Sequence, residues 1–288
     1  MTTLDNLSVL SDSQRNRSNA VKKLVVSSIQ NSKNGVIGFD EFMEIVLYTE
    51  NLGYYDAGDK IFGKDGDFLT APSSGQLFGE CVANELGPAL NSLDCNILEF
   101  GAGSGSLAKS VCSALSEFHD FHSYSYHIIE PNESLWIDQK AATKDLSGGF
   151  SWYKNLPRHL SKGVLIANEV IDAMPATRYM VYKGKVHELG VSLSDQELVW
   201  KEKNTDVPEQ IKRDLNGYED GYRTEMINGL EPWLNSIFSS FEELVFFIID
   251  RTPLILLAIT GMPQLIASNW TIPKASNEFI LGRIKTSN

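Results

Sequence analysis

The sequence predicts an α/β protein built on a doubly wound parallel sheet, and two observations lead to that fold class. Short apolar segments alternate with segments of helical period over residues 96–169, and strands that alternate with helices pair in parallel as βαβ units. The same region begins with a strand, a glycine-rich turn and the start of a helix, in that order. Because such sheets bind ligands at the carboxyl ends of their strands, we expect a site there.

Helices and a long loop precede the predicted sheet. Apolar residues at helical spacing predict a helix over 13–30 and a second one from Phe39 that ends before Gly53. The segment Gly53–Gly79 is rich in glycine and interleaved with aromatic residues, which favours an ordered, functional loop. A further helix over 76–90 leads into the first strand of the sheet.

The later elements follow from changes of period along the chain. The predicted helices are 106–115, 133–146 and 223–238, and the predicted parallel strands are 124–129, 150–153, 164–167 and 244–249. A period of two over 179–182, 186–191 and 198–200 predicts an antiparallel meander inserted into the α/β core. We therefore divide the chain into an N-terminal helical and loop region (1–92), a sheet-forming core (93–175 and 221–250), the meander (176–220) and an atypical tail (251–288).

Composition and charge limit the function classes. The chain has 288 residues, of which 42% are hydrophobic and 22% are charged, as in a globular protein with a substantial core. Its formal net charge of −12 disfavours a nucleic-acid groove, because phosphate binding requires a basic surface. We therefore expect no nucleic-acid partner, and the sequence does not indicate an oligomeric state.

The N-terminus and the cysteines favour a cytoplasmic protein of a bacterium. The first ten residues lack a basic segment followed by an apolar one, and Asp5 and Asp12 are unlike a transit peptide. Three cysteines without a C-x-x-C pair do not suggest disulfides. The apolar run Pro253–Ile259 is far shorter than the ~20 residues that a membrane span requires. We expect no membrane span and no metal site.

Three glycines at alternate positions, Gly101, Gly103 and Gly105, follow the first predicted strand. Glycines suit a turn with positive φ and let a ligand approach bare backbone. A dinucleotide motif, G-x-G-x-x-G, fails from Gly101 because Ser106 stands in its last position, and it is met only loosely from Gly103. The usual pattern for S-adenosylmethionine (SAM), an acid, one residue and G-x-G-x-G, is met in full from Glu99. We therefore take Glu99 and the three glycines as cofactor-binding residues.

Glu130, at the end of the second predicted strand, completes the predicted cofactor site. An ionised carboxylate can accept hydrogen bonds from both ribose hydroxyls of SAM. Acids near the cofactor also suit its sulfonium cation, whereas they would repel a pyrophosphate. An NAD(P)-dependent oxidoreductase remains the alternative enzyme, and purely structural glycines are the alternative without a ligand.

The run N-E-V-I-D-A-M-P, Asn168–Pro175, is a second concentration of polar residues at a predicted strand end. Methyl transfer is an in-line displacement, so an enzyme mainly positions the two partners and excludes water. If the nucleophile is a guanidinium nitrogen, Glu169 and Asp172 could hold its planar group through paired hydrogen bonds. In the alternative interpretation, Asp172 caps a turn and Glu169 pairs with a surface cation.

Several segments of the chain occur together in one order. They are F-x-x-F-M with L-Y ahead of G-Y-Y (39–55), F-G-x-x-G-D-F-x-T-A-P (62–72) with L-F-G (77–79), E-F-G-A-G-S-G (99–105), N-E-V-I-D-A-M-P (168–175), and Y-R-T-E-M with P-W-L (222–234). Each segment alone has low specificity, whereas the set in register is specific. Over about residues 39–250 the chain thereby resembles the MidA family of SAM-dependent methyltransferases.

The resemblance implies a Rossmann-like methyltransferase fold, SAM as cofactor and a protein arginine as substrate. The mitochondrial members of the family methylate an arginine of a core subunit of respiratory complex I and so assist its assembly, which implies a respiratory-chain subunit as a partner. The residues implied to contact the cofactor are Gly101, Gly103, Gly105 and Glu130, with a loop over the same pocket that contains Gly66, Asp67, Thr70 and Pro72. The residues implied to face cofactor and substrate are Asn168, Glu169 and Asp172.

After Asp250 the chain departs from the family pattern. The family continues this strand with Y-G and a long segment that completes the sheet, whereas here R-T-P-L-I-L-L-A-I-T-G-M-P-Q follows. Residues 1–250 contain 21 basic and 36 acidic side chains and residues 251–288 four and one, so the net charge changes from −15 to +3. We interpret the tail as a frameshifted or replaced end that leaves the last strands missing and a sheet edge exposed. A catalytically weak or inactive assembly-factor or binding protein that retains the methyltransferase fold is therefore a further alternative.

Overall fold

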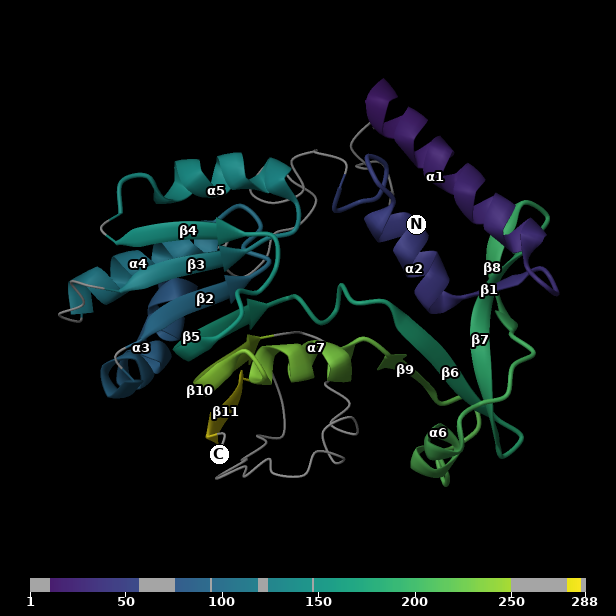
Figure 1. The fold of residues 1–288 in the computed structure, drawn as a ribbon. Helices are drawn as coiled ribbons and strands as arrows, with labels where there is room; N and C mark the ends of the chain where they lie inside the picture. Colours follow the sequence, from purple (N-terminus) through teal and green to yellow (C-terminus); the bar gives the residue numbers. More distant parts are fainter. Residues whose placement is uncertain are drawn as a thin grey trace, which may run out of the picture. The chain divides into compact units, whose positions relative to one another are not determined.

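Two compact units make up the chain in the computed structural model (Figure 1). The meander unit comprises Met1–Ala57 and Pro175–Asn228, and the parallel-sheet unit comprises Gly58–Met174 and Gly229–Asn288. The structure describes residues 11–56, 76–93, 95–118, 124–146 and 148–249, together with the backbone of a strand at 279–285. The predicted loop residues Gly66, Asp67, Thr70 and Pro72 lie outside the described residues, as does Asp250.

The parallel-sheet unit contains a six-stranded sheet in the order β11-β10-β5-β2-β3-β4. Its strands are β2 (Asn96–Phe100), β3 (Ser125–Ile129), β4 (Gly149–Tyr153), β5 (Leu160–Asn168), β10 (Phe241–Ile249) and β11 (Phe279–Lys285). All pairs among β2, β3, β4, β5 and β10 are parallel. The chain runs outward from β2 to β3 and β4 and then returns to β5 on the other side of β2. This reversal beside β2 is the switch point of a doubly wound sheet, which confirms the predicted fold class.

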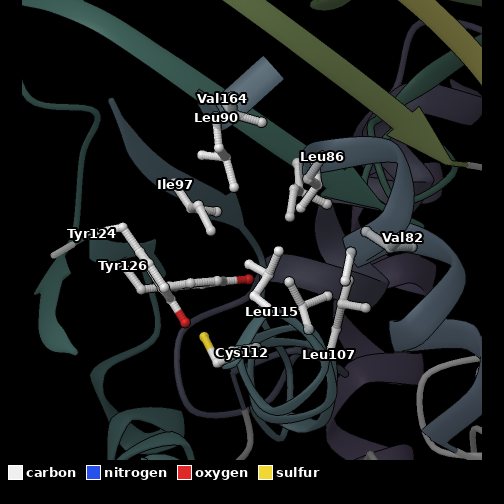
Figure 2. Packing of buried hydrophobic residues seen from close by; sticks show 14 of the residues in the cluster. Val82, Leu86, Leu90, Ile97, Leu107, Cys112, Leu115, Tyr124, Tyr126 and Val164 are labelled. Carbon is white, nitrogen blue, oxygen red and sulfur yellow. The ribbon is translucent and has the colours of Figure 1, made fainter. Parts of the chain in front are cut away.

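Helices α3 (Gln76–Leu93) and α4 (Ser106–Phe118) cover one face of this sheet. The apolar cluster that they share with the strands is shown in Figure 2 and includes Val82, Leu86, Leu90, Leu107, Leu115, Ile97, Tyr126 and Val164. The two helices approach each other closely at Gly79, where a Cβ atom would lie 2.3 Å from Cβ of Ser110. The predicted helices over 76–90 and 106–115 are thus confirmed, and both extend further at their carboxyl ends.

Helix α7 (Leu230–Phe238) covers the other face. Phe100 and Phe246 alternate along their strands with residues of the α3–α4 cluster, so their side chains point away from it. Both rings pack on Trp233 of α7, with ring centroids 5.3 and 5.8 Å apart. The sheet is therefore covered on both faces, as expected for parallel strands.

The register brings the carboxyl ends of the central strands to one edge of the sheet. Phe100 at the end of β2 lies opposite Ile129 of β3 and Ala167 of β5. Asn168 at the end of β5 lies opposite Ile249 of β10. The residues that follow β2, β3 and β5 consequently lie close together at the switch point.

The outer edge of β10 is paired, unlike our expectation of an exposed edge after the last predicted strand. β11 comes from the tail and runs antiparallel to β10, from Glu243 opposite Lys285 to Ile249 opposite Phe279. The backbone of β11 therefore supplies hydrogen-bonding partners where we expected missing strands.

The meander unit contains a five-stranded antiparallel sheet in the order β1-β7-β6-β9, with β8 paired to β7. Its strands are β1 (Val36–Gly38), β6 (Ala176–Tyr182), β7 (Lys185–Ser194), β8 (Glu197–Glu202) and β9 (Arg223–Ile227), and its helices are α1 (Asp12–Asn31), α2 (Phe39–Tyr48) and α6 (Glu209–Asp214). The predicted meander is confirmed as β6, β7 and β8. The two predicted N-terminal helices are confirmed as α1 and α2.

Two elements of this region differ from the prediction. The predicted helix over 223–238 is wrong in its first part, because Arg223–Ile227 pair with β6 as strand β9 and the helix begins at Leu230. The short strand β1 was not predicted at all. It approaches β7 closely at Gly190, where a Cβ atom would lie 2.2 Å from the carbonyl oxygen of Ile37. Both segments are strands because they pair with segments that are distant in the sequence, and local periodicity does not reveal such pairing.

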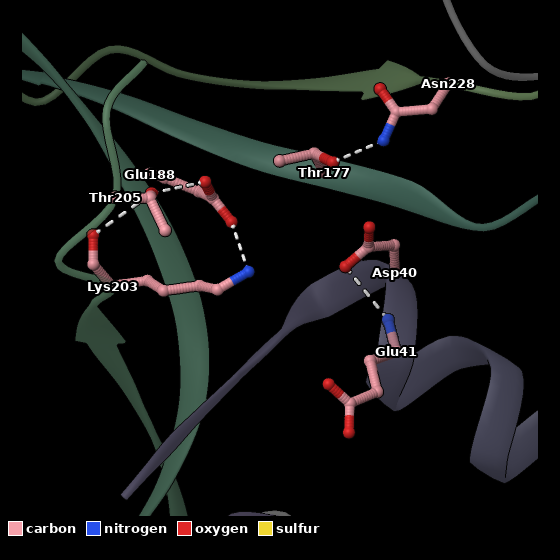
Figure 3. A network of polar contacts seen from close by, with 7 residues as sticks. All are labelled: Asp40, Glu41, Thr177, Glu188, Lys203, Thr205 and Asn228. Atoms are coloured by element: carbon pink, nitrogen blue, oxygen red, sulfur yellow. Dashed lines mark hydrogen bonds and ion pairs between the residues drawn. The ribbon is translucent and has the colours of Figure 1, made fainter. Parts of the chain in front are cut away.

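A buried carboxylate, Glu188, joins β7 to the segment after β8 (Figure 3). Its oxygens accept hydrogen bonds from Nζ of Lys203 at 2.9 Å and from Oγ1 of Thr205 at 2.6 Å. In the same region Nδ2 of Asn228 donates to Oγ1 of Thr177 at 2.7 Å, which joins the end of the β9 segment to β6. Because its acid is satisfied within the chain, we interpret this network as structural.

Candidate functional site

The glycine turn after β2 has the backbone conformation that its sequence predicts. Gly101, Gly103 and Gly105 have φ values of 61°, 52° and 78°, in the left-handed region that favours glycine. The N–H of Gly101 donates to the carbonyl of Ile129 at 3.0 Å, so the turn is tied to the end of β3. At Gly105 a Cβ atom would lie 3.0 Å from Cα of Gln139. The turn thus packs directly on helix α5 (Trp136–Thr143), which follows the 3₁₀ turn η2 (Glu133–Leu135).

Glu130 follows β3 directly and is held by hydrogen bonds on both carboxylate oxygens. Oε1 accepts from the N–H of Asn132 at 3.0 Å, and Oε2 accepts from Nε2 of Gln139 at 3.3 Å. The side chain is buried, and the backbone carbonyl of Glu130 accepts from Nε1 of Trp136 at 3.1 Å. The predicted ribose acid therefore lies beside the glycine turn in a fixed orientation.

Glu99, the acid that precedes the turn, is also buried but has a different partner. Its Oε2 accepts a hydrogen bond from the hydroxyl of Tyr126, on the neighbouring strand β3, at 2.8 Å. Ile97, two residues earlier on the same face of β2, belongs to the apolar cluster under α3 and α4. Glu99 is therefore anchored at the edge of this apolar cluster by its hydrogen bond to Tyr126.

Burial changes the acidity of both carboxyls. It raises the pKa of Glu99 and that of Glu130 from their ordinary value of 4.5 to about 7. At Glu99 the hydrogen bond from Tyr126 lowers the pKa and the nearby Glu130 raises it, and both effects are smaller than that of burial. Both groups consequently change protonation near neutral pH, where small changes in their surroundings alter their charge.

The N-E-V-I-D-A-M-P run lies beside the glycine turn on the other side. A Cβ atom at Gly101 would lie 3.5 Å from Cγ2 of Val170. Asn168 is the last residue of β5, and the N–H of Glu169 donates to the carbonyl of Ile249 at 2.7 Å. Glu169 has a positive φ of 52°, a conformation that costs a non-glycine residue of the order of 1–3 kcal/mol and that occurs often at functional sites. Asp172 is exposed, and Ile171 before it is buried.

The fit of the site to SAM depends on how many further hydrogen bonds its polar groups can accept. Each oxygen of an ionised carboxylate offers two lone pairs, so Glu130 can accept two further donors after its bonds to Asn132 and Gln139. Those donors can be the two ribose hydroxyls of SAM. At Gly101 the only atom within 4 Å of a Cβ position is Cγ2 of Val170, among the described residues, so a ligand can approach the backbone there. The described residues therefore fit the cofactor that the sequence predicts.

Sequence reasoning missed the side chains that join these parts. Gln139 is fully buried and donates from Nε2 to the carbonyl of Gly103 at 3.0 Å as well as to Glu130. Its Oε1 accepts from Nε1 of Trp152 on β4 at 3.0 Å. The sequence shows only a glutamine within an ordinary helical pattern, and this residue becomes informative once the fold buries it against the turn.

Within the described ranges, no group of three or more His, Cys, Asp or Glu side chains is arranged to hold a metal ion. Among the described helices, none has both the length and the apolar character needed to cross a membrane.

Comparisons with known proteins point to SAM-dependent methyltransferases. Residues 81–253 match the family model described as "Putative S-adenosyl-L-methionine-dependent methyltransferase". Protein arginine methyltransferase NDUFAF7 of Xenopus laevis is 30% identical over 208 residues, which is 62% of this chain and 47% of that protein. The mitochondrial NDUFAF7 homologue of Caenorhabditis elegans is 28% identical over 205 residues, again 62% of this chain and 47% of the relative.

A solved structure is similar over most of the chain. It is a protein of Burkholderia thailandensis, described as a "likely methyl transferase", bound to S-adenosyl-homocysteine. It is 27% identical with a TM-score of 0.73 and covers 85% of this chain and 65% of its own. The chain spans about half the length of the curated relatives it matches. With the family model covering more than half of the sequence, the chain belongs to the MidA family of SAM-dependent methyltransferases.

Proposed function

We propose that this protein uses SAM to methylate an arginine side chain of a protein substrate. One observation carries the proposal. At the switch point of the sheet, a turn with three left-handed glycines is connected through the side chain of Gln139 to the buried carboxylate of Glu130. The arginine specificity is supported by relatives that are named protein arginine methyltransferases. S-adenosyl-homocysteine (SAH), the product of SAM after methyl transfer, is the ligand of the similar Burkholderia protein.

Within this proposal, the described residues have separate roles. Glu130 and the backbone of Gly101, Gly103 and Gly105 hold the cofactor, with Glu99 as a buried acid beneath them. Asn168, Glu169 and Asp172 position the substrate guanidinium. A carboxylate matches the planar fork of a guanidinium through two parallel hydrogen bonds, which would orient one nitrogen toward the methyl group. The resemblance to the family implies that Gly66, Asp67, Thr70 and Pro72 also contribute to cofactor binding.

We propose further that the substrate is a respiratory-chain subunit and that the protein acts in the cytoplasm of a bacterium. The first part is supported by the resemblance to family members that act on complex I. The second is supported by likeness to bacterial proteins over 85% of the chain.

Calorimetric titration with SAM, SAH and NADH tests the cofactor. We expect SAM and SAH to bind and NADH not to bind, because the turn matches the SAM pattern and two buried acids would repel a pyrophosphate. Binding of NADH without SAM would overturn the proposal in favour of an oxidoreductase.

Methyl transfer from isotope-labelled SAM to the proteins of a cell extract, followed by mass spectrometry, tests the activity. We expect labelled methyl groups on arginine. The variants Glu169→Gln and Asp172→Asn should still bind SAH and should lose transfer by roughly 10²-fold, the effect of misplacing a reacting group. Tight SAM binding without any transfer would instead identify a binding protein that retains the fold.

A further inference from the structure

Gln139 is the point at which three parts of the cofactor site meet. Its amide nitrogen donates to the carbonyl of Gly103 at 3.0 Å and to Oε2 of Glu130 at 3.3 Å. Its amide oxygen accepts from the indole N–H of Trp152 at 3.0 Å. The side chain therefore connects the glycine turn after β2, the acid after β3 and strand β4.

The partners of Gln139 fix which way its amide group points. An amide presents a donor end and an acceptor end, and the indole nitrogen of Trp152 is only a donor. The oxygen of Gln139 must therefore face Trp152, which directs the NH₂ group toward Gly103 and Glu130. The two acceptors on that side use both of its N–H bonds, so the amide group is satisfied at three of its positions.

Helix α5, which carries Gln139, is itself held against the glycine turn and the end of β3. A Cβ atom at Gly105 would lie 3.0 Å from Cα of Gln139 and 3.3 Å from Cβ of Ala142, so the glycine turn packs directly on the helix backbone. At the start of the helix, Nε1 of Trp136 donates to the backbone carbonyl of Glu130. Nζ of Lys140 lies 5.4 and 5.1 Å from the ring centroids of Trp136 and Trp152, so a cation packs on both indoles.

A structural role alone does not require these particular partners. A core position between a helix and a turn is usually filled by an apolar side chain, because a buried amide must find a partner for every polar atom. Here the partners are the two groups that would contact opposite parts of the ligand, the turn backbone and the ribose acid. Thr143, one turn further along α5, is also buried but donates only to the backbone carbonyl of Gln139, at 2.9 Å.

We propose that Gln139 is a positioning residue of the cofactor site, which sets the orientation of the Glu130 carboxylate relative to the glycine turn, with Trp152 fixing the amide of Gln139. The proposal rests on the proposed function, because it assumes that Glu130 accepts hydrogen bonds from the ribose hydroxyls of the cofactor.

The test compares the binding of SAH with that of its 2′-deoxy analogue, by calorimetry, in four proteins. The wild-type protein should bind the analogue roughly ten-fold more weakly than SAH, the loss of one hydrogen bond to a charged group. Gln139→Leu keeps the approximate volume and removes all three hydrogen bonds. Its affinity for SAH should be roughly ten-fold lower than that of the wild type. Its preference for SAH over the analogue should fall to about two-fold, because a misplaced carboxylate no longer accepts a hydrogen bond from the 2′-hydroxyl.

Trp152→Phe is the milder variant, since it keeps an aromatic ring for the contact with Lys140 while it removes the indole N–H donor and the second ring of the indole. It should reduce the preference for SAH in the same direction, to an intermediate value. Thr143→Val is the matched control, because it removes a buried hydrogen bond of the same helix, to the backbone carbonyl of Gln139, and leaves the hydrogen bonds of the Gln139 side chain unchanged. It should leave the preference at the wild-type value even if it lowers the midpoint of thermal unfolding.

The outcomes separate the inference from the proposed function. If Gln139→Leu and Trp152→Phe both keep the wild-type preference for SAH over the analogue, Gln139 does not position Glu130 and the inference is overturned. A wild-type protein that binds neither ligand would overturn the proposed function itself, and the inference with it. If Gln139→Leu does not fold, the preference measured in Trp152→Phe decides.

Discussion

The carboxylate of Glu130 is where a single residue should matter most for the cofactor. Glu130→Gln keeps the size of the side chain but replaces a charged acceptor by a neutral amide. We expect SAH to bind more weakly by about 1.5–3 kcal/mol, the range for hydrogen bonds to charged groups. Isothermal titration measures the difference. Glu133→Gln is the control, since Glu133 lies three residues further on, is exposed and pairs only with Lys154 among the described ion pairs. Equal affinities of wild type and Glu130→Gln would remove Glu130 from the site.

The buried acid Glu99 should make stability depend on pH. Burial raises the pKa of this carboxyl from 4.5 to about 7, so the folded chain binds its proton more tightly than the unfolded chain does. The resulting contribution to stability is complete below about pH 4.5 and is lost as the pH rises through about 7. Glu99→Gln carries no such proton and keeps an acceptor for Tyr126.

We therefore expect Glu99→Gln to gain stability relative to wild type as the pH is raised from 5 to 8. Thermal unfolding of the two proteins without ligand, measured across this range, gives the comparison. Tyr126→Phe in the Glu99→Gln background is a control for the hydrogen bond itself, and it should lower stability equally at every pH. Parallel pH profiles of wild type and Glu99→Gln would show that Glu99 does not titrate in this range.

At the scale of elements, the turn between β2 and α4 should tolerate side chains unequally. Gly101→Ala and Gly105→Ala both place a Cβ atom on a left-handed residue, which costs roughly 1–2 kcal/mol in each case. At Gly101 the new atom would lie at an ordinary 3.5 Å from Val170, whereas at Gly105 it would lie 3.0 Å from the backbone of Gln139. Gly105→Ala should therefore destabilise the protein more than Gly101→Ala does. Urea unfolding without ligand measures both, and equal losses would mean that α5 moves away without cost.

This turn also shows what the sequence could predict about the fold and the site. Positive φ at alternate glycines is a local steric requirement, so the residues alone indicate it, and the parallel strands around it follow from an equally local period. Strand β9 was mistaken for helix because its pairing with β6 joins segments more than 40 residues apart. Gln139 was missed for a related reason. Its three partners lie in the turn after β2, directly after β3 and on β4, and only the assembled sheet brings them together.

At the scale of the whole molecule, the chain passes between its two compact units three times, after Ala57, Met174 and Asn228. Neither unit is therefore a contiguous piece of sequence. The N-terminal helices share a unit with the meander because β1 pairs with β7, and no local pattern predicts that grouping. The candidate catalytic run Asn168–Pro175 contains one of these passages, between Met174 and Pro175. Changes in that run therefore act on a segment that belongs to both units.

The edge of the parallel sheet provides the last prediction. β10 is among the most apolar strands of the sheet, and β11 covers its outer edge by antiparallel pairing over residues 279–285. A strand edge without a partner presents unpaired N–H and C=O groups to other chains and promotes aggregation. We therefore expect a chain that ends at Ile249 to aggregate and to unfold at a lower temperature than the full chain. Size-exclusion chromatography and thermal unfolding measure the two effects.

A second variant separates the pairing of β11 from the mere presence of a tail. Replacing residues 279–285 by a glycine–serine stretch of equal length keeps the tail but removes the side chains that favour a strand. If edge pairing is what protects β10, this variant should behave like the shortened chain. A shortened chain that stays monomeric and as stable as the full protein would show that β11 contributes nothing to the sheet. In that case β5 and α7 would be sufficient to hold β10 in place.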